Sequence, residues 1–257
     1  MIFGVVIVTF NRPQLLERAI KSIISQDYEN WLTVIINNGD SIQEFSDKRI
    51  IQVQAEDNLG SNKARNLALD ILIDKKVNYL TIIDDDDYLE QGSFSEANNM
   101  ILETNKSWLI SNCLTPNEKL EESKKPILKI QEFDYIDDYL YGNNFSGDKF
   151  HMIKTSLIQN IRFDKKIFNG EEWLFFIKLA KKSKILAYPH VSLRKDYQDG
   201  GLTKRIKTRK KTFQKLIIET KKPILSFLIR PTNLKAFRKA ISRIFELPFK
   251  IIKLSFS

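Results

Sequence analysis

Short apolar runs recur along the first third of the chain, separated by longer segments of mixed polarity. Four runs lack the alternation of apolar and polar residues that marks a strand with one wet face: Val5–Val8, Leu32–Ile36, Ile50–Val53 and Tyr79–Ile83. Runs of this length and texture are typical of strands that are covered on both faces. We therefore predict four buried strands that lie parallel in one sheet.

Two of the intervening segments have helical spacing. Pro13–Gln26 begins with a proline in its first turn and carries its apolar residues on one stripe, and Gly60–Asp74 carries a similar stripe. The order strand, helix, strand thus occurs twice. It predicts an α/β fold with an open, mostly parallel sheet that is flanked by helices and joined by right-handed crossovers.

The second half of the chain has a less regular pattern, without an internal repeat or a low-complexity tract. We predict these elements there: strands over Trp108–Leu114, Lys149–Ile153 and Ile185–Leu193, helices over Phe133–Tyr141 and Glu171–Lys182, and a charged loop over Thr115–Lys129.

Composition and charge separate the chain into two parts. The 257 residues are 42% hydrophobic, which is enough to bury a core and excludes disordered and fibrous classes. The formal charge of +9 is uneven: residues 204–257 hold 16 Lys and Arg against two acids, whereas residues 1–203 hold 25 against 30. An acidic body therefore carries a basic tail. Cys113 is the only cysteine, so an intrachain disulfide is excluded and a reducing cytosol is expected.

The apolar stretch Ile2–Phe10 is predicted to be a strand rather than a leader or an anchor. It lacks the basic start and the cleavage site of a secretion signal, and it is shorter than the ~20 residues that span a bilayer. No other stretch reaches spanning length. We therefore expect any membrane contact to come from one face of the protein.

Four consecutive aspartates, Asp84–Asp87, directly follow the fourth predicted strand. Adjacent carboxylates repel one another unless a positive charge lies among them. Oxygen ligands select hard divalent ions, and such sites commonly use one or two carboxylates. The run therefore predicts a Mg²⁺ or Mn²⁺ site, and the alternative is a solvated acidic turn.

Other polar segments fall at the same predicted edge of the sheet, where ligands bind in open α/β sheets. Asn37–Asp40 is either a plain turn or a contact to a nucleobase or ribose. Gly60–Asn66 begins a helix, whose N-terminus suits a phosphate, although an ordinary N-cap explains its composition equally well. Glu171 and Glu172 begin a later helix, either as favourable first-turn acids or with one of them as a general base.

Together these segments resemble family 2 glycosyltransferases, which are inverting enzymes with a GT-A fold. The matching segments stand in the family's order: Val5–Pro13 with its opening strand and turn, Asn58–Gly60 and Ala64–Asn66 with its second segment, Ile82–Asp87 with its DXD metal motif, and Phe163–Asp164 and Gly170–Trp173 with its FD…ED-W segment. The resemblance covers residues 1–203, which we assign to a GT-A domain, and it leaves residues 204–257 as a basic amphipathic helical tail.

The resemblance implies a donor site at the strand ends. It places Asp86, with Asp84 beside it, on the Mn²⁺ or Mg²⁺ that binds the diphosphate of a nucleotide sugar, with a UDP-sugar as the expected donor. Asn38 stands where the family usually has an aspartate that reads the nucleobase. The other residues implied for donor binding are Thr9, Asn11, Arg12, Asp40, Arg65, Asp84 and Asp85.

The resemblance also implies a base and an acceptor region. Glu172 stands where the family more often has its catalytic aspartate. Arg194–Thr203 resembles the segment after the family's last core strand, with Asp196 near the place of a histidine, where it would reach the metal or the diphosphate. The residues expected at the acceptor or in a lid are Glu171, Trp173, Arg194 and Asp196.

The implied activity is metal-dependent, inverting transfer of a hexosyl or N-acetylhexosaminyl group to a hydroxyl of a lipid-linked or cell-surface glycan. A rival interpretation is a non-catalytic nucleic-acid-binding protein with a degenerate α/β body, because basic chains often bind nucleic acid. Nucleotidyl transfer would use the same acids on a triphosphate, but the Glu172 segment fits it poorly.

The tail has the pattern of a helix that lies in a membrane interface, with apolar residues at helical spacing and basic residues between them. The residues expected to contact an anionic membrane are Lys235, Phe237, Arg238, Lys239, Ile241, Arg243, Ile244 and Phe245. Pro223, Pro231 and Pro248 predict that the tail is divided into short pieces. We expect a cytoplasmic protein, peripheral on the inner face of the plasma membrane and without a nucleic-acid partner. A helix that packs on the acidic body or forms a homo-oligomer remains the other interpretation of the tail.

Overall fold

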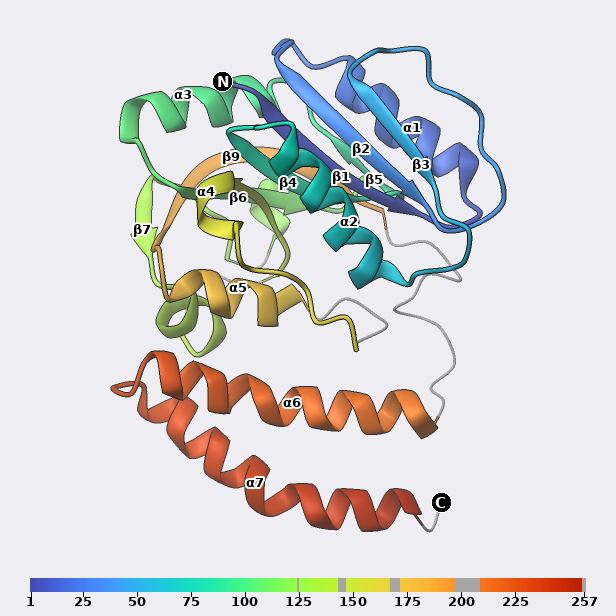
Figure 1. The fold of residues 1–257 in the computed structure, drawn as a ribbon. Coiled ribbons are helices and arrows are strands. Elements are labelled where there is room, and N and C mark those ends of the chain that lie inside the picture. The colour runs from blue at the N-terminus through green and yellow to red at the C-terminus, as the bar shows by residue number, and fades with distance from the viewer. Residues whose placement is uncertain (124, 143–146, 167–171, 197–208, 256–257) are drawn as a thin grey trace.

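A computed structural model of the protein describes residues 1–123, 125–142, 147–166, 172–196 and 209–255 (Figure 1). Within these residues a nine-stranded mixed sheet forms the centre, with the order β3-β2-β1-β4-β8-β6-β9-β5 and with β7 beside β9. The strands are β1 (Phe3–Thr9), β2 (Trp31–Asn37), β3 (Ile50–Gln54), β4 (Tyr79–Asp84), β5 (Asp87–Leu89), β6 (Trp108–Leu114), β7 (Gln131–Phe133), β8 (Lys149–Lys154) and β9 (Ile185–Lys195).

Helices cover both faces of this sheet and extend below it. They are α1 (Pro13–Ile24), α2 (Ser61–Asp74), α3 (Ser93–Thr104), α4 (Thr155–Ile158), α5 (Glu172–Ala180), α6 (Arg209–Ile229) and α7 (Leu234–Ser255), together with a 3₁₀ turn η1 (Leu120–Glu122) and a π-helical turn η2 (Tyr135–Leu140). The observed architecture is the α/β fold with a helical C-terminus that the sequence predicts.

The first half of the sheet confirms the four predicted strands. Each of β1 to β4 extends its predicted range by at most two residues at either end, and neighbouring strands run parallel, with Val5 opposite both Thr33 and Thr81. The second half is mixed, because β8 lies antiparallel between β4 and β6 while β9 runs parallel to β6. The carboxyl ends of β1, β2 and β4 therefore meet at one edge.

Some elements of the second half differ from their predictions. The helix predicted over Phe133–Tyr141 shortens to η2, since Phe133 ends β7, which pairs with β9. The strand β5 and the helix α3 are not anticipated from the pattern. Three residues are too few to show a periodicity, and the sequence of α3 is largely polar, so pairing and packing decide both elements.

Two apolar layers hold the helices on the sheet. On one face, α1 and α3 bury Leu16, Ile20 and Phe94 against Phe3 and Val5. The other face is covered by α2, η2 and α5, whose buried residues include Ala68, Leu72, Ile136 and Ile177. Because both faces are covered, the central strands are apolar throughout, which is the texture seen in the sequence.

The tail forms a helical hairpin rather than short pieces, so that part of the prediction is wrong. α6 continues through Pro223 and α7 through Pro248, whereas Pro231 lies in the connection between them. Each internal proline removes one backbone donor, but α7 packs against α6 (Figure 1), with the rings of Phe227 and Phe237 5.0 Å apart and Arg243 paired with Glu219. Packing between the two helices outweighs the local break.

The hairpin also packs on the body. Ile218 and Leu225 of α6 contact Trp173 and Leu174 of α5, and the turn after α6 is held by charge. Arg230 Nη2 lies 2.6 Å from Asp134 Oδ2 at the start of η2. The tail therefore contacts acidic residues of its own body, in agreement with one of the interpretations left open by the sequence.

One buried amide fixes the segment that leads to α5, and it generates a prediction about stability. Asn66 of α2 donates from Nδ2 to the carbonyl of Phe163 (2.9 Å) and accepts from the Phe163 amide (2.8 Å). Asn66→Ala leaves two buried backbone groups without partners, at about 1–3 kcal/mol each. We expect the free energy of unfolding in urea to fall by about 2–6 kcal/mol.

The matched control for this variant is Lys63→Ala, because Lys63 is exposed on the same helix. Its effect is expected to stay within about 0.5 kcal/mol. Equal unfolding free energies for wild type and Asn66→Ala would show that the amide does not hold this segment.

Candidate active site

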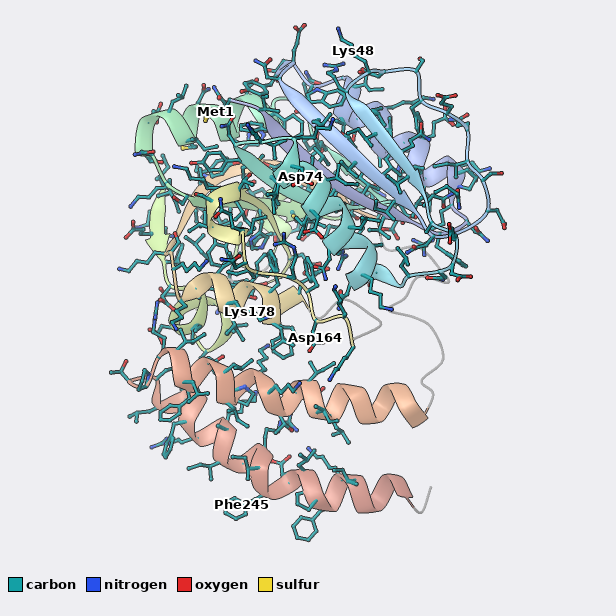
Figure 2. The ribbon with its side chains drawn as sticks, viewed as in Figure 1. Met1, Lys48, Asp74, Asp164, Lys178 and Phe245 are labelled. Carbon is teal, nitrogen blue, oxygen red and sulfur yellow. The ribbon has the colours of Figure 1, made fainter. Side chains whose placement is uncertain are left out.

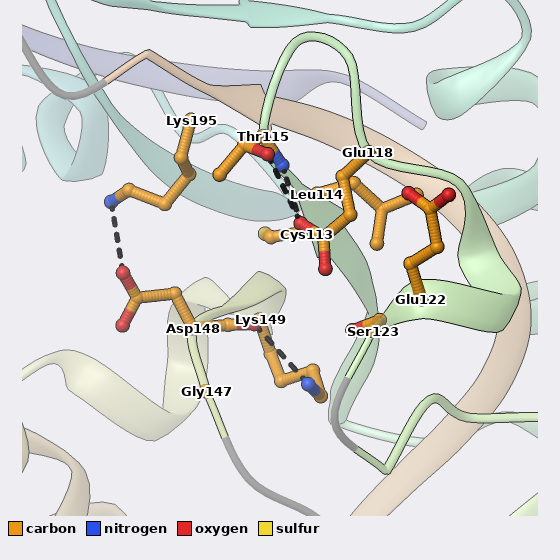
Figure 3. A pocket seen from close by; sticks show the side chains of 10 residues that line it. All are labelled: Cys113, Leu114, Thr115, Glu118, Glu122, Ser123, Gly147, Asp148, Lys149 and Lys195. Carbon is orange, nitrogen blue, oxygen red and sulfur yellow. Dashed lines mark hydrogen bonds and ion pairs between the residues drawn. The ribbon is translucent and has the colours of Figure 1, made fainter.

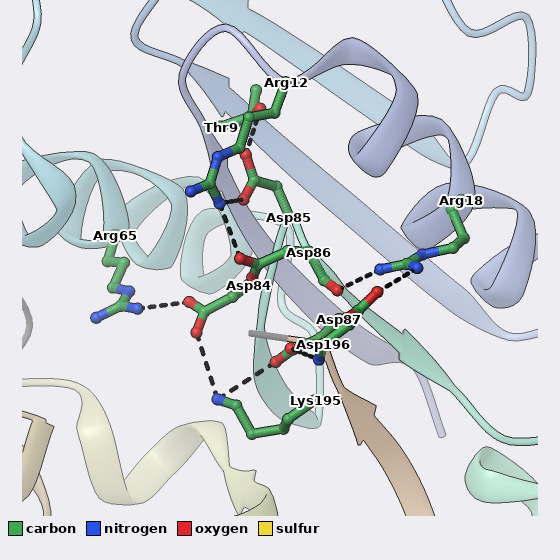
Figure 4. A network of polar contacts seen from close by, with 10 residues as sticks. All are labelled: Thr9, Arg12, Arg18, Arg65, Asp84, Asp85, Asp86, Asp87, Lys195 and Asp196. Carbon is green, nitrogen blue, oxygen red and sulfur yellow. Dashed lines mark hydrogen bonds and ion pairs between the residues drawn. The ribbon is translucent and has the colours of Figure 1, made fainter. Parts of the chain in front are cut away.

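The four aspartates form the connection between β4 and β5. Asp84 is the last residue of β4 and Asp87 the first residue of β5, so the run is part of the sheet edge and not a solvated turn (Figure 4). Asp85 and Asp87 are buried at 6% and 2% exposure. Buried carboxylates require positive or hydrogen-bonding partners, and each of the four has one.

Asp85 turns back into the protein instead of facing a ligand. Its Oδ2 accepts a hydrogen bond from Thr9 Oγ1 at 2.7 Å, and its Oδ1 lies 3.1 Å from Arg12 Nη1. Burial raises the pKa of Asp85 to about 6 despite these partners. Thr9 and Asp85, both expected at the donor, thus join the ends of β1 and β4.

Arg12 links the aspartate run to the start of α1. The same Nη1 atom also lies 2.8 Å from Asp86 Oδ2. Burial and the neighbouring charge of Asp84 raise the pKa of Asp86, while Arg12 opposes this rise. Arg12 therefore holds the Asp86 carboxylate in a fixed position at the edge.

Arg65 joins two carboxylates that are far apart in the sequence. Its side chain is only 7% exposed, with Nη2 2.8 Å from Asp84 Oδ1 and Nη1 2.8 Å from Glu172 Oε1. Burial alone would raise the pKa of Asp84, but the charges of Arg65 and Lys195 lower it to about 2. The residue proposed as a base is thereby placed beside the aspartate run.

Lys195, at the end of β9, is a member of the site that sequence reasoning missed. Its Nζ lies 3.3 Å from Asp87 Oδ2, 3.4 Å from Asp84 Oδ2 and 3.7 Å from Asp148 Oδ2. Burial raises the pKa of Asp87 to about 7, although the Lys195 charge opposes this. Lys195 lies inside the segment Arg194–Thr203 that resembles the family, but only the order of the second half of the sheet brings the end of β9 to this edge and its side chain to the aspartates.

Arg18 is a second missed residue. It lies one and a half turns into α1. Its Nη1 is 2.6 Å from Asp196 Oδ2, and its Nη2 donates a hydrogen bond to the Asp86 carbonyl at 2.5 Å. The amide of Asp196 donates to Asp87 Oδ1 at 3.3 Å. Asp196 thus lies at the site, as expected, and it is paired with an arginine.

A cavity of about 360 Å³ opens beside Lys195 (Figure 3). It lies between the end of β6, the loop that follows it and the start of β8. Its lining residues are Cys113, Leu114, Thr115, Glu118, Glu122, Ser123, Gly147, Asp148, Lys149 and Lys195. The volume falls within the range of about 300–1,000 Å³ that is usual for small-molecule sites.

The charges around the aspartate run remain acidic even with these basic partners. Within the described residues, the ion-paired group contains seven carboxylates, from Asp84, Asp85, Asp86, Asp87, Asp148, Glu172 and Asp196, and four cations, from Arg12, Arg18, Arg65 and Lys195. Three negative charges are in excess when all seven carboxylates are ionised. A group of this kind attracts a cation.

The residues fit a hard divalent ion of the Mg²⁺ or Mn²⁺ type that takes part of its ligands from a substrate. In the part of the chain that the structure describes, no three His, Cys, Asp or Glu residues are grouped to hold a metal by themselves. Sites of this type need only one or two carboxylates, with water and phosphate oxygens as the other ligands. Asp84 and Asp86 carry such oxygens, which in this structure are paired with Arg65, Lys195 and Arg12.

The turn after β2 is built around its amides. Asn38 is buried and its Oδ1 accepts from the Leu59 amide at 3.3 Å, so it ties β2 to the loop before α2. Asn11 Oδ1 accepts from the Asp40 amide at 2.7 Å. A Cβ on Gly39 would lie 1.9 Å from that oxygen, which explains the glycine. The Asp40 side chain remains exposed at this edge.

The residues expected at the acceptor are dispersed. Trp173 packs on the tail, with Lys222 Nζ 5.1 Å from its ring centroid. Arg194 pairs with Glu90 and donates to the carbonyl of Glu118 at 2.8 Å, so it braces the loop after β6. Glu171 lies outside the described residues. Of these four residues, only Asp196 lies beside the aspartate run in the described part of the chain.

Known proteins resemble this chain in sequence. The family profile described as "Glycosyl transferase family 2" matches residues 4–162. The chain is 29% identical over 217 residues to the "GalNAc(5)-diNAcBac-PP-undecaprenol beta-1,3-glucosyltransferase" of Campylobacter jejuni, covering 78% of this chain and 66% of that protein. It is 27% identical over 190 residues to an uncharacterized glycosyltransferase of Methanocaldococcus jannaschii, covering 68% and 63%. The chain thus spans about two thirds of the length of these relatives.

Solved structures share the fold. S. aureus TarS 1-349 in complex with UDP-GlcNAc superposes with a TM-score of 0.71 at 16% identity, covering 96% of this chain and 73% of TarS 1-349. Another crystal structure of TarS 1-349 gives 0.68 at 15%, covering 96% and 72%. Since the family profile spans more than half of the chain, from β1 to the segment after α4, this protein belongs to glycosyl transferase family 2.

Proposed function

We propose that this protein is an inverting glycosyltransferase that moves a sugar from a nucleotide-diphosphate sugar to a hydroxyl of a glycan. The observation that carries the proposal is the double ion pair of Arg65, which holds Glu172 beside Asp84. A base for the acceptor and acidic oxygens for a metal-bound diphosphate are thus adjacent at the sheet edge. Family membership supports the reaction class.

The proposed reaction is one in-line displacement. The acceptor oxygen forms a bond to the anomeric carbon while the bond from that carbon to the diphosphate oxygen breaks, and its electron pair leaves with the nucleotide diphosphate. Glu172 takes the proton of the hydroxyl. A single displacement inverts the anomeric configuration and needs no covalent enzyme intermediate.

Asp84 and Asp86 are the proposed ligands of Mn²⁺ or Mg²⁺, which when bound would neutralise charge on the leaving diphosphate. Arg12 and Arg65 hold these two carboxylates in position. Lys195 neutralises Asp84 and Asp87 from the opposite side. An acidic site would otherwise repel a diphosphate, so the balance of these charges is part of donor binding.

We further propose a UDP-sugar with a hexosyl or N-acetylhexosaminyl group as the donor. The support is the shared fold of TarS, which was solved with UDP-GlcNAc. The cavity beside Lys195 has room for a sugar and adjoins the aspartate run. Asn38, Asp40 and Asn11 stand at the edge where the nucleoside would lie.

For the acceptor, we propose a lipid-linked or cell-surface glycan. The support is the Campylobacter jejuni relative, whose name specifies an undecaprenol-linked substrate. The protein would then work on the inner face of the plasma membrane, as a peripheral protein. The nucleic-acid-binding alternative is not favoured, since the body belongs to a glycosyltransferase family and its strand edge is acidic.

The base role predicts a separation of binding from catalysis. Glu172→Gln keeps the size of the side chain but removes its ability to take a proton. We expect kcat for sugar transfer to fall about 10²–10⁴-fold. Donor affinity, measured by calorimetry with Mn²⁺, is expected to be unchanged, because Asp84 still holds Arg65.

Glu132→Gln is the matched control, since Glu132 lies on β7 and pairs with Lys106 away from the site. It is expected to retain full activity. Unimpaired transfer by Glu172→Gln would refute the base role, and lost donor affinity would mean that Glu172 acts by holding the site together.

The metal role makes a prediction for Asp86. Asp86→Asn removes the charge of a proposed ligand, and we expect Mn²⁺-dependent donor affinity to fall by more than about 100-fold, beyond the 10–100-fold typical of outer-shell partners. Calorimetry with UDP-sugars, in the presence and absence of Mn²⁺, measures this. Asp70→Asn, an exposed α2 residue paired with Arg162, is the control and should bind like wild type. The assignment fails if Mn²⁺ strengthens donor binding equally in wild type and Asp86→Asn.

A further inference from the structure

The second helix of the tail has two apolar sides, and only one is covered. Ala236 and Ala240 are buried, and α7 packs on α6. Large apolar residues at helical spacing lie along another side and are exposed: Leu234, Phe237, Ile241, Ile244, Phe245 and Phe249. We call these six residues the outer face of α7. Figure 2 shows Phe245 directed away from the body.

The exposure of this face is unusual for a soluble surface. Phe245 and Phe249 are 70% and 74% exposed, and the six residues follow one another along four turns of the helix. Single exposed apolar residues need no explanation, but a contiguous apolar stripe marks a contact surface. Phe237 lies where this stripe meets α6, because its ring centroid is 5.0 Å from that of Phe227. The most exposed residues of the stripe are Phe245 and Phe249, toward the end of α7.

Basic residues border the outer face at its first turns. Arg238 and Lys239 are exposed there. The sequence also predicts Arg243 at the membrane. In the structure its side chain instead pairs with Glu219 of α6 at 3.6 Å and with Glu246 at 3.3 Å. Lys235 is exposed too, and its Nζ donates to the carbonyl of Tyr141 at 3.0 Å. Arg238 and Lys239 therefore form the basic border of the outer face, which is narrower than the sequence pattern suggests.

We propose that the outer face of α7 inserts into the interface of an anionic lipid membrane, with the helix lying in the membrane plane. Within the described residues no helix has the length and apolar character to cross a bilayer. A helix with an apolar stripe beside basic residues instead buries the stripe at the boundary of headgroups and acyl chains. The basic border then meets anionic headgroups.

Charge favours lipid over the other occupants of such a face. A second copy of the chain would bring another basic border against Arg238 and Lys239, which repels. Nucleic acid would match the phenylalanines and the border cations, but it offers no apolar partner to the aliphatic Leu234, Ile241 and Ile244. In an anionic membrane, the acyl chains would contact the apolar stripe and the negative headgroups would contact its basic border.

This inference deepens the proposed function, on which its biological meaning rests, because it brings the site to a membrane that holds a lipid-linked acceptor. Docking is nevertheless measured without turnover. The full chain is sedimented with vesicles of phosphatidylcholine, alone or with about one third phosphatidylglycerol, at low and high salt. Donor hydrolysis with Mn²⁺ is assayed in parallel.

The test variant is Phe245→Ser with Phe249→Ser, and the matched control is Leu102→Ser with Leu128→Ser, two residues exposed to a similar degree outside the tail. We expect the test variant to lose at least about tenfold in vesicle affinity, and the control to bind like wild type. Arg238→Gln with Lys239→Gln is expected to lose about 25-fold for anionic vesicles, or about fivefold per charge, and to show less salt dependence. Donor hydrolysis stays unchanged in all three.

Several outcomes would overturn the inference. Failure of the wild-type chain to sediment with anionic vesicles is one, and unchanged binding by the serine variant is another. If sedimentation velocity shows a dimer that the serine variant dissolves without altered vesicle binding, the face belongs to a second copy. Salt-sensitive RNA binding that depends on Arg238 and Lys239 but not on the two phenylalanines would assign the border to nucleic acid. Vesicle binding without transfer of any nucleotide sugar would refute the proposed function and leave the docking intact.

Discussion

The buried guanidinium of Arg65 is the contact on which the site depends. One side chain of α2 pairs with Asp84 at the end of β4 and with Glu172 at the start of α5, and it is only 7% exposed. Because a buried cation is stable only with its partners, Arg65 couples the position of the proposed base to that of the aspartate run. The packing of α2 and α5 on the sheet therefore also brings the proposed base close to the aspartate run.

The rest of the edge follows from the same need to balance buried charge. Arg12 from the turn before α1, Arg18 from α1 and Lys195 from β9 approach the four aspartates, and among the described residues the carboxylates still exceed the cations. Side chains therefore already supply part of the positive charge that the sequence assigns wholly to a metal. What remains is an acidic edge that suits a hard cation shared with a diphosphate.

The strands and helices that place this edge could be predicted where the local pattern is decisive. β1 to β4 are buried on both faces, so their apolar texture indicates them directly, and the stripes of α1 and α2 do the same. The tail shows the opposite case. Pro223 and Pro248 predict breaks, but packing between α6 and α7 overrides them, and that packing alone selects which side of α7 is exposed.

For the site itself, the sequence determined the chemical types that meet at the strand ends, because residues that follow parallel strands share one edge whatever the rest of the fold does. It thus indicated Asp84–Asp87 as members, whereas Arg65 and Glu172 were implied by the resemblance to family 2 glycosyltransferases. Tertiary structure alone decided that Asp85 turns inward to Thr9, that Trp173 packs on the tail, and that Lys195 and Arg18 join the aspartates. The physical reason is that these contacts link elements up to 111 residues apart, and only the order of the mixed sheet sets which strand end lies beside which.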